Sequence, residues 1–459
     1  MLLLRRDRDG AAGQQRARPQ KGLDLPLRDA ALAPSILAGR GSTALLIVLA
    51  VPILAAAAAF GYQLDRGIGV TGLNDQVFWG VYTVNLVTFI GFSYGGALVS
   101  AILRLTNAHW RGPIVRLAEG TALVTLLVGA AFPIIHLGHP ERVWQMFTRP
   151  QLNSPLLWDM VAIATYMLAT LLLFVLPLIP DLATLQDHER LGLRRSRLYR
   201  ALGMGWQGTP HQRASLERAL TILAVTIIPV AIMVHTVLSY AFSLTSRPGW
   251  HSTIFGPYFV VAAVYSGVGI VIVAVVAYRR AYRLESWITE RSIRSLGYIM
   301  VTLGAIYAYF LFTEITTEGY VGEEASQTLL HGLILGRYAT LFWMFVAGGI
   351  VAPLLLVTVR RTRTVAGITT AALLVIVAMW LKRFLMFVPP LTRPLIGDQV
   401  GSYSPSVVEL TITAGAVAAI PFLLIVLFRV VPVLSVYEIQ ELGHPALEPH
   451  RVPAGGEGR

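Results

Sequence analysis

The sequence contains no cysteine among its 459 residues. Without cysteine the chain cannot form a disulfide, hold a thiolate-bound iron–sulfur cluster or attach haem covalently through a CxxCH motif. A redox function would therefore need a diffusible cofactor, a histidine-ligated haem or metal centres carried by another subunit. Charge is also scarce, because only 14% of the residues are charged whereas a soluble chain carries about a quarter.

Apolar residues make up 55% of the chain and are concentrated in runs long enough to cross a membrane. A helix needs about 20 predominantly apolar residues to cross the ~30 Å hydrocarbon layer. The sequence therefore predicts an all-α integral membrane protein with about ten transmembrane helices. The expected spans are 42–62, 77–103, 114–137, 155–179, 218–244, 254–278, 292–315, 332–359, 364–388 and 406–430.

Lysine and arginine are unevenly distributed between the loops. They are concentrated in residues 1–40, 104–116, 181–218 and 279–294, which lie in alternate connections. Because cytoplasmic loops carry the excess of Lys and Arg, this pattern predicts cytoplasmic termini and an even number of crossings. The same topology explains the net charge of +12, so lipids are expected partners and nucleic acid is not.

Two expected spans resemble each other. The stretch FSYGGALVSAILRL (92–105) and the stretch VYSGVGIVIVAVVAYR (264–279) both run from outside to inside and carry an arginine at the inner end. A duplication of four-helix units would explain this, and so would the general preference of membrane helices for small residues. The expected division is a cytoplasmic basic tail (1–40), a first helix plus first four-helix bundle with the site (42–244), a second four-helix bundle (254–388), and a last helix with a cytoplasmic tail (406–459).

Ionisable side chains at membrane depth are costly and therefore informative. Asp159 lies four residues after Pro155, about 6 Å inside the outer start of its helix at a rise of 1.5 Å per residue. Ser154 is the expected N-cap of that helix. His136 ends the preceding span from the same side, so His136 and Asp159 are expected to lie near one face of the membrane.

Further polar residues are expected in the same outer half by depth alone. His235, Glu314 and Arg337 are candidates for a ligand site on this basis. Structural roles are equally compatible with the sequence: His235 can be a core histidine, and Glu314 can be a solvated helix end. Lys382 and Arg383 can reach the outer head groups along their apolar stems.

One carboxylate is expected in the inner half of the membrane. Glu119 lies three residues after Arg116 and is expected to be its intrahelical partner, with a proton path as the second interpretation. Tyr298, Thr302 and Tyr307 lie along the seventh span and are the other candidates for such a path.

Quinol oxidation would use a histidine and a carboxylate of this kind. A quinol is apolar and releases two electrons and two protons, so its site needs apolar walls and a base near each hydroxyl. A neutral histidine and a partly desolvated aspartate can both accept protons near neutral pH. His136 and Asp159 are therefore the expected catalytic residues. No metal site is expected in this chain, and the electrons would pass to a partner outside the membrane.

The stretches HLGHPER (136–142) and NSPLLWD (153–159) resemble the NrfD/PsrC-type family of polysulfide reductase membrane subunits. GWHSTIFGPYFVVAAVYSG (249–267), WLKRF (380–384) and PVLSVYEIQEL (432–442) extend the resemblance over roughly residues 42–442. Within the family, the chain is similar to the quinol-site subunit ActC of bacterial alternative complex III. It departs from many members at His139, where they have arginine.

The resemblance implies a fold of two four-helix bundles with flanking helices in a bacterial cytoplasmic (inner) membrane. It implies menaquinol binding near the periplasmic face of the first bundle, with His136 and Asp159 matching the quinol-site residues of the family. It also implies a periplasmic iron–sulfur subunit, haem c subunits and a homologous sister membrane subunit as partners, and proton translocation coupled to the redox reaction.

Several alternatives are compatible with the sequence. The chain can be the quinone subunit of a polysulfide or molybdopterin reductase, or a sister subunit without a catalytic site. A secondary transporter would place its charged groups near the bilayer midplane, whereas these lie in the outer half. A di-haem subunit would use His136, His235 and His331 as axial ligands, which requires histidines on facing helices.

Overall fold

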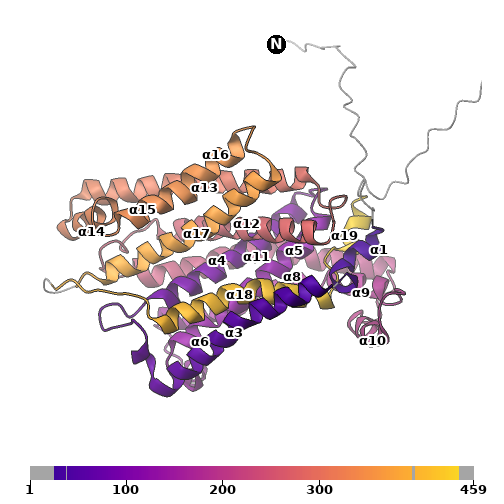
Figure 1. Ribbon diagram of the computed structural model, residues 1–459, viewed down its shortest axis with the longest axis horizontal. Coiled ribbons are helices and arrows are strands. Elements are labelled where there is room, and N and C mark those ends of the chain that lie inside the picture. Colours follow the sequence, from indigo (N-terminus) through magenta and orange to yellow (C-terminus); the bar gives the residue numbers. More distant parts are fainter. Residues whose placement is uncertain (1–24, 38, 395–398, 444–459) are drawn as a thin grey trace, which may run out of the picture.

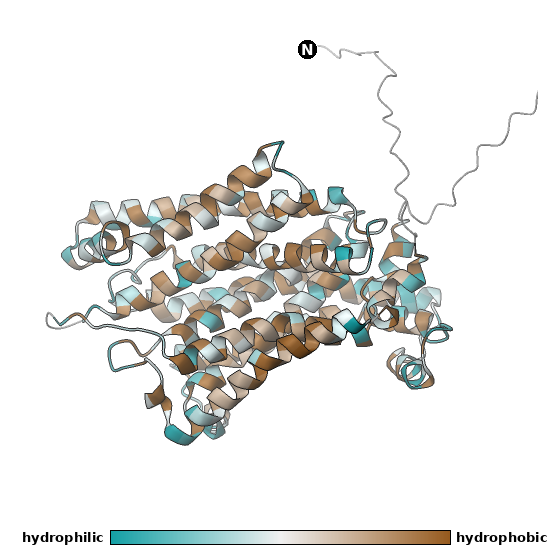
Figure 2. Cartoon of the chain, viewed as in Figure 1, coloured by the Kyte–Doolittle hydropathy of each residue, from teal (hydrophilic) through white to brown (hydrophobic). Residues whose placement is uncertain are grey.

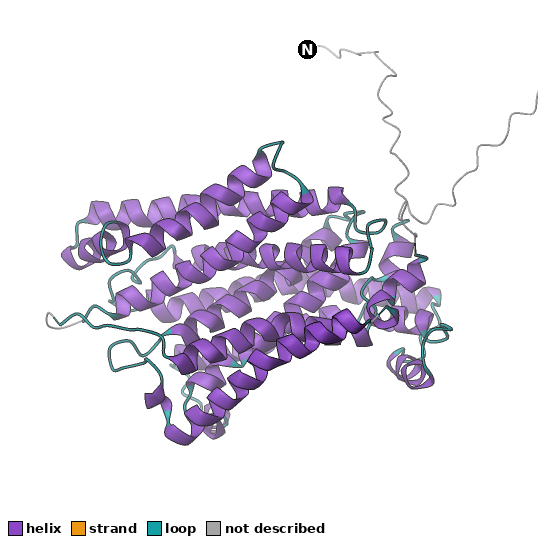
Figure 3. Cartoon of the chain, viewed as in Figure 1, coloured by secondary structure: helices purple, strands orange, loops and turns teal. Residues whose placement is uncertain are grey.

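The computed structural model describes residues 25–37, 39–394 and 399–443. Within these ranges the chain consists of helices and connecting loops without a strand (Figure 3). The ends of the predicted tails, residues 1–24 and 444–459, lie outside the described residues. The predicted all-α class is confirmed.

Ten helical stretches of the described chain are long and apolar enough to cross a membrane, as predicted. They are α3 (Arg40–Arg66), α4 (Val81–Leu105), α5 and α6 (Gly112–Ala130 and Phe132–His136), α8 and α9 (Pro155–Val175 and Leu178–Leu185), α11 (Pro210–Ser243), α12 (Phe255–Ala281), α13 (Glu290–Val321), α15 and α16 (Ala339–Val346 and Ala352–Thr358, joined by the π-helical turn Ala347–Val351), α17 (Val365–Leu391) and α18 (Val407–Val430). The shorter helices are α1 (Leu27–Ala31), α2 (Ala33–Ile36), α7 (Gln145–Thr148), α10 (Leu193–Leu202), α14 (Glu324–Ile334) and α19 (Val436–Glu441).

The long helices run side by side along the longest axis of the molecule (Figure 1). Hydrophobic residues cover their middle parts and hydrophilic residues gather near their ends (Figure 2). Both ends of the described chain lie at one end of the molecule, beside α1, α9 and α19. This is the predicted inner end, and the loop that follows His136 lies at the predicted outer end. Which end faces the cytoplasm stays a prediction.

The helices pack in two groups and a flanking pair. In the first helix group, α4 packs against α5 and α11, and α8 packs against α5 and α11. In the second helix group, α12 packs against α13 and α17, and α16 packs against α13 and α17. Helices α3 and α18 pack against each other, and α18 also contacts α5. The groups meet where α4 crosses α12.

The crossing of α4 and α12 depends on two glycines. A Cβ atom added to Gly95 would lie 1.8 Å from the carbonyl carbon of Gly267. A Cβ atom added to Gly267 would lie 2.3 Å from the backbone nitrogen of Gly95. Small residues let the backbones of membrane helices approach this closely. The two glycines belong to the two stretches whose sequences resemble each other.

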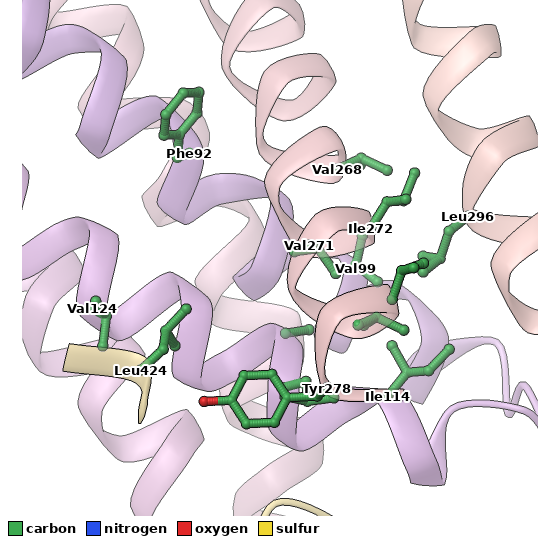
Figure 4. Close-up of a cluster of buried hydrophobic side chains, with 14 of the residues drawn as sticks. Phe92, Val99, Ile114, Val124, Val268, Val271, Ile272, Tyr278, Leu296 and Leu424 are labelled. Atoms are coloured by element: carbon green, nitrogen blue, oxygen red, sulfur yellow. The ribbon is translucent and has the colours of Figure 1, made fainter. Parts of the chain in front are cut away.

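Apolar side chains fill the inner part of this crossing (Figure 4). Val268, Val271 and Ile272 of α12 lie between Val99 of α4 and Leu296 of α13, and all five are buried. Buried aliphatic side chains leave no polar partner for a ligand or a proton. The polar residues that α4 and α12 contribute to the outer half are therefore separated from the inner end by an apolar layer.

The inner end is closed by buried ion pairs with the C-terminal segment. The carboxylate of Glu438 on α19 accepts hydrogen bonds from Arg104 and, at 3.1 Å, from Nε of Arg111. Asp181 accepts a bond of 2.6 Å from Nη2 of Arg116 and one of 2.7 Å from the backbone nitrogen of Tyr437. Because an unpaired buried charge is strongly destabilising, these pairs hold α19 beneath the first helix group.

The glycine contact predicts that Gly95→Ala destabilises the protein. The added methyl group has to displace a backbone, which costs about 1–3 kcal/mol or more in a packed core. Gly61→Ala on α3 is the control, because no atom lies within 4 Å of the position of its Cβ. Thermal unfolding in detergent, followed by size-exclusion chromatography, should show a lower midpoint for Gly95→Ala alone. Equal midpoints for the two variants would contradict the role assigned to the crossing.

Candidate functional site

His136 is held at the predicted outer end by contacts with the loop before α4 and with the first turn of α4. Its Nε2 lies 3.0 Å from the carbonyl oxygen of Phe78, and its ring packs edge-on against Tyr82, with 6.1 Å between centroids. A carbonyl oxygen only accepts hydrogen bonds, so Nε2 carries the proton and Nδ1 can accept another. The side chain of Gln63 donates to the carbonyl oxygen of Ile135 at 2.8 Å and accepts a bond from the Tyr82 hydroxyl at 2.5 Å.

Glu409 lies near His136 but has a structural role. Its carboxylate accepts hydrogen bonds from the Gly72 nitrogen at 2.7 Å and from the Tyr403 hydroxyl at 2.5 Å. The Tyr403 oxygen in turn accepts a bond of 2.9 Å from the nitrogen of Val81 at the start of α4. Burial and the hydrogen bond to Glu409 raise the pKa of Tyr403 well above its usual range, so the hydroxyl stays a donor. Glu409 therefore links α18 to the N-terminal end of α4.

Asp159 is buried near the outer start of α8. The helix begins at Pro155 after Ser154, as predicted, although the Ser154 side chain makes no capping bond. Only 6% of the Asp159 surface is exposed, and Oδ1 has no hydrogen-bond partner in the described part of the chain. Tyr166 lies seven residues further along α8 and hence on the same face of the helix.

Tyr94 lies between Tyr166 and His235. Its ring stacks on Tyr166 at 4.8 Å between centroids and lies edge-on to His235 at 4.3 Å. The Tyr166 hydroxyl is 3.0 Å from Oγ of Ser93. The Tyr94 hydroxyl and both ring nitrogens of His235 are buried and have no partner among the described residues. We refer to Tyr94, Asp159, Tyr166 and His235, from α4, α8 and α11, as the aromatic cluster.

The aromatic cluster has the composition expected of a site for an aromatic ligand. Buried polar atoms are normally hydrogen-bonded, so several unpartnered ones together require an explanation. Aromatic walls with a few convergent polar groups are typical of small-molecule sites. The sequence predicted Asp159 and His235 but missed Tyr94 and Tyr166. Two signals were available, namely the Tyr94-Gly95 pair in the repeated stretch and the seven-residue spacing of Asp159 and Tyr166.

The structure does not join the two predicted catalytic residues directly. His136 bonds the Phe78 carbonyl group, and Asp159 shares a face of α8 with Tyr166, with no hydrogen bond or ion pair between His136 and Asp159 in the described chain. Both residues lie at the predicted outer ends of adjacent helices, because α5 packs against α8. Their catalytic role stays a prediction.

A second set of polar residues lies where the two helix groups meet. A narrow cavity is lined by His235 of the first group and by Tyr258, Tyr307, Lys382 and Arg383 of the second. Nη2 of Arg383 donates to Oγ of Ser266 at 3.1 Å, whereas Nη1 has no partner in the described part of the chain.

Lys382 and Arg383 point into the protein. Lys382 donates to Oε2 of Glu314 at 3.0 Å, and the Tyr258 hydroxyl lies 3.2 Å from that oxygen and 3.1 Å from the Tyr307 hydroxyl. Only 7% of Lys382 and 2% of Arg383 is exposed. The proposed extension of these side chains to the head groups is therefore wrong, as is the interpretation of Glu314 as a solvated helix end.

Beyond Glu314 the protein is hollowed towards the predicted outer end. A second cavity is lined by Glu314, Glu318, Ser326 and Lys382 together with apolar side chains of α13, α14 and α17. It shares Lys382 with the cavity that contains His235. His235 and Glu314 thus belong to one polar region that crosses the boundary between the two helix groups.

The remaining predicted residues lie elsewhere. Arg337 is exposed and lies over the ring of its neighbour Tyr338. Tyr298 and Thr302 are exposed on α13, whereas Tyr307 is buried, so the three do not share one interior face. His331 is exposed on α14, which does not favour the di-haem arrangement.

Glu119 is buried on α5 and is only weakly paired with Arg116. Its Oε1 accepts a hydrogen bond of 2.7 Å from Ser100, whereas Oε2 lies 3.9 Å from Nη1 of Arg116 and accepts no hydrogen bond from the described residues. The closer partner of Arg116 is Asp181. Sequence spacing predicted the contact with Arg116 but gave no indication of the stronger, long-range pair.

A sequence model of the family described as "Polysulphide reductase, NrfD" matches residues 69–394. The chain belongs to the NrfD family. The matched region includes the loop after His136, the aromatic cluster and both cavities. The resemblance to this family on the HLGHPER and NSPLLWD stretches is therefore confirmed.

Curated relatives cover most of the chain at low identity. A putative dimethyl sulfoxide reductase membrane subunit from Halobacterium salinarum is 25% identical over 81% of the chain and 87% of its own length. A selenate reductase subunit from Mesobacillus selenatarsenatis is 24% identical over 81% and 90%. The Hdr-like menaquinol oxidoreductase integral membrane subunit of Archaeoglobus fulgidus is 26% identical over 85% and 95%. NrfD membership thus extends over both helix groups.

The aromatic cluster of this NrfD protein predicts different effects for two matched substitutions. Tyr94→Phe removes a hydroxyl that bonds no described residue, so the thermal midpoint should stay unchanged or rise. Tyr265→Phe removes a buried bond of 2.6 Å to the Gly349 carbonyl oxygen and should cost about 1–3 kcal/mol. Thermal unfolding of the purified protein measures both effects. An equal loss of stability in the two variants would show that the Tyr94 hydroxyl makes a structural hydrogen bond and would contradict the prediction.

Proposed function

We propose that this chain is the quinol-binding membrane subunit of a respiratory oxidoreductase complex. It binds menaquinol in the outer half of the first helix group and oxidises it there. The observation that carries the proposal is the aromatic cluster, in which one oxygen of the Asp159 carboxylate, the Tyr94 hydroxyl and both ring nitrogens of His235 are buried without partners among the described residues. Membership of the NrfD family supports it.

Quinol oxidation requires a proton acceptor near each of the two hydroxyl groups of the quinol. Menaquinol loses two protons and two electrons as it becomes menaquinone. Asp159 accepts one proton, since its free oxygen can receive a hydroxyl hydrogen. His136 accepts the other through Nδ1, because the Phe78 carbonyl group keeps the proton of the ring on Nε2. Tyr94, Tyr166 and His235 supply the walls and orient the head group.

The electrons pass to partner subunits. No cysteine is present to hold an iron–sulfur cluster or a covalent haem in this chain. We assign the acceptor to an extrinsic iron–sulfur subunit on the periplasmic side of a bacterial cytoplasmic membrane, followed by haem c subunits, with a homologous sister membrane subunit beside this chain. Such a complex is like alternative complex III, and the chain would occupy the place of ActC in it.

The named relatives suggest a second candidate. Two of them carry the names of dimethyl sulfoxide and selenate reductase subunits, and the third is named a menaquinol oxidoreductase subunit. A reductase with the same quinol site in its membrane subunit would deliver the electrons to a terminal reductase instead of haem c. The partners that co-purify with the chain distinguish the two candidates.

Isolation of the intact complex tests the site and the class together. Asp159→Asn and His136→Ala should each lower quinol oxidation roughly a hundredfold or more, because each removes a proton acceptor, while the partners still co-purify. Asp75→Asn, an exposed carboxylate in an outer loop, is the control. The optical spectrum should show haem c and iron–sulfur absorption. Full turnover in an intact Asp159→Asn complex would refute the site assignment.

We further propose that Glu119 takes part in proton translocation. It is a buried carboxylate with one oxygen that accepts no hydrogen bond from the described residues, and it lies close to the ion pairs of the inner end. A carboxylate that is only weakly paired can bind and release a proton without breaking a buried salt bridge. Tyr307 is the one residue of the predicted tyrosine path that lies in the interior.

Glu119→Gln should lower the number of protons moved per electron in proteoliposomes while quinol oxidation continues, because glutamine cannot exchange a proton. Glu290→Gln, which alters an exposed carboxylate paired with Arg294, is the control. The ratio is measured from external acidification during a pulse of electron acceptor. An unchanged ratio together with an unchanged rate would remove Glu119 from the path.

A further inference from the structure

Helix α10 is a short basic helix at the predicted inner end. It has ten residues, LRRSRLYRAL, of which four are arginine and none is acidic. It packs against α9, which continues the membrane span that starts at Pro155. In Figure 1, α10 is seen nearly end-on, so it runs across the direction of the membrane-crossing helices beside their inner ends. Its position is that of a helix lying along the membrane surface.

Two contacts fix the orientation of α10. The buried Tyr199 hydroxyl donates to the carbonyl oxygen of Val430 at 2.8 Å. The Arg195 guanidinium donates to Oγ of Ser35 on α2. Both anchors lie on the face of α10 that packs on the protein, and they join it to the C-terminal and N-terminal segments. The opposite face makes no hydrogen bond or ion pair in the described chain beyond the exposed ion pair of Arg200 with Asp187.

The unpartnered face combines arginine with exposed leucine. Arg194, Arg197 and Arg200 follow one another at intervals of three residues, so they form one band, and all are exposed. Arg200 pairs with Asp187 at 3.2 Å through two largely exposed side chains, a type of ion pair that contributes little. Leu193 is 79% exposed beside this band, and Met204, just past the helix, is 68% exposed. Exposing these large apolar side chains to water alone would be unfavourable, so this face of α10 is expected to contact something else.

We infer that α10 binds the phosphate head groups of anionic phospholipids. The arginine band supplies the complementary charge, since a juxtamembrane basic residue gains attraction from an anionic lipid surface. Leu193 and Met204 reach the boundary with the acyl chains, as the apolar residues of interfacial helices do. An acidic protein surface would satisfy the arginines but would leave the exposed leucine unexplained. The inference is independent of the quinol site.

Charge removal tests the arginine band. The triple variant Arg194→Gln, Arg197→Gln and Arg200→Gln leaves the anchors Arg195 and Tyr199 intact. The control triple, Arg291→Gln, Arg360→Gln and Arg361→Gln, removes the same charge from exposed positions at the same end. Detergent-solubilised protein is titrated with phosphatidylglycerol and followed by native mass spectrometry. The α10 variant should bind roughly tenfold more weakly or worse, and equal weakening in the control would overturn the assignment.

A fluorescent probe tests the position of Leu193. Because the chain lacks cysteine, Leu193→Cys introduces a single labelling site. In vesicles that contain phosphatidylglycerol the emission should shift to the blue and be quenched by lipid-borne quenchers, and the shift should be smaller in phosphatidylcholine alone. A probe at Arg360→Cys is the control. An emission that stays water-like in both vesicles, or that changes only when partner subunits are present, would overturn the proposal.

Discussion

The close approach of α4 and α12 at Gly95 and Gly267 determines how the rest of the structure is arranged. The two backbones touch where any side chain would separate them, and α4 and α12 also contact helices on both sides of the boundary. The position of this crossing along α4 and α12 determines which side chains face each other in the outer half of the protein. Tyr94, the neighbour of Gly95, is directed to Tyr166 and His235, while Ser266, the neighbour of Gly267, binds Arg383.

Polarity changes along the crossing. The outer half contains unpartnered polar atoms and two cavities that share Lys382. Below the glycines, aliphatic side chains fill the space between α4, α12 and α13. The inner end again contains charges, but most of these are paired, as Arg104 and Arg111 are with Glu438. Unpaired buried polar groups are costly, so the unpartnered atoms of Tyr94, Asp159 and His235 in the outer half support the ligand site proposed there.

Local sequence patterns were sufficient to identify some of the residues of the candidate site. A charge within an apolar helix is visible in sequence, which identified Asp159, Glu119 and Glu314 as exceptional. Their partners were not predictable, because they come from helices distant in the chain: Ser100 for Glu119, Lys382 for Glu314. Depth alone also placed Arg337 with the site, yet depth does not specify which way a side chain points, and Arg337 is exposed.

The sequence by itself determined the ten membrane-crossing helices and the family, because apolar length and the motifs around His136 and Asp159 are properties of contiguous residues. Only the tertiary structure decided which residues meet. It gave His136 a backbone partner that does not include Asp159, brought Tyr94 between Tyr166 and His235, and turned Lys382 and Arg383 inward. The physical reason is that the rotation and pairing of helices depend on packing between segments far apart in the chain, which no local periodicity encodes.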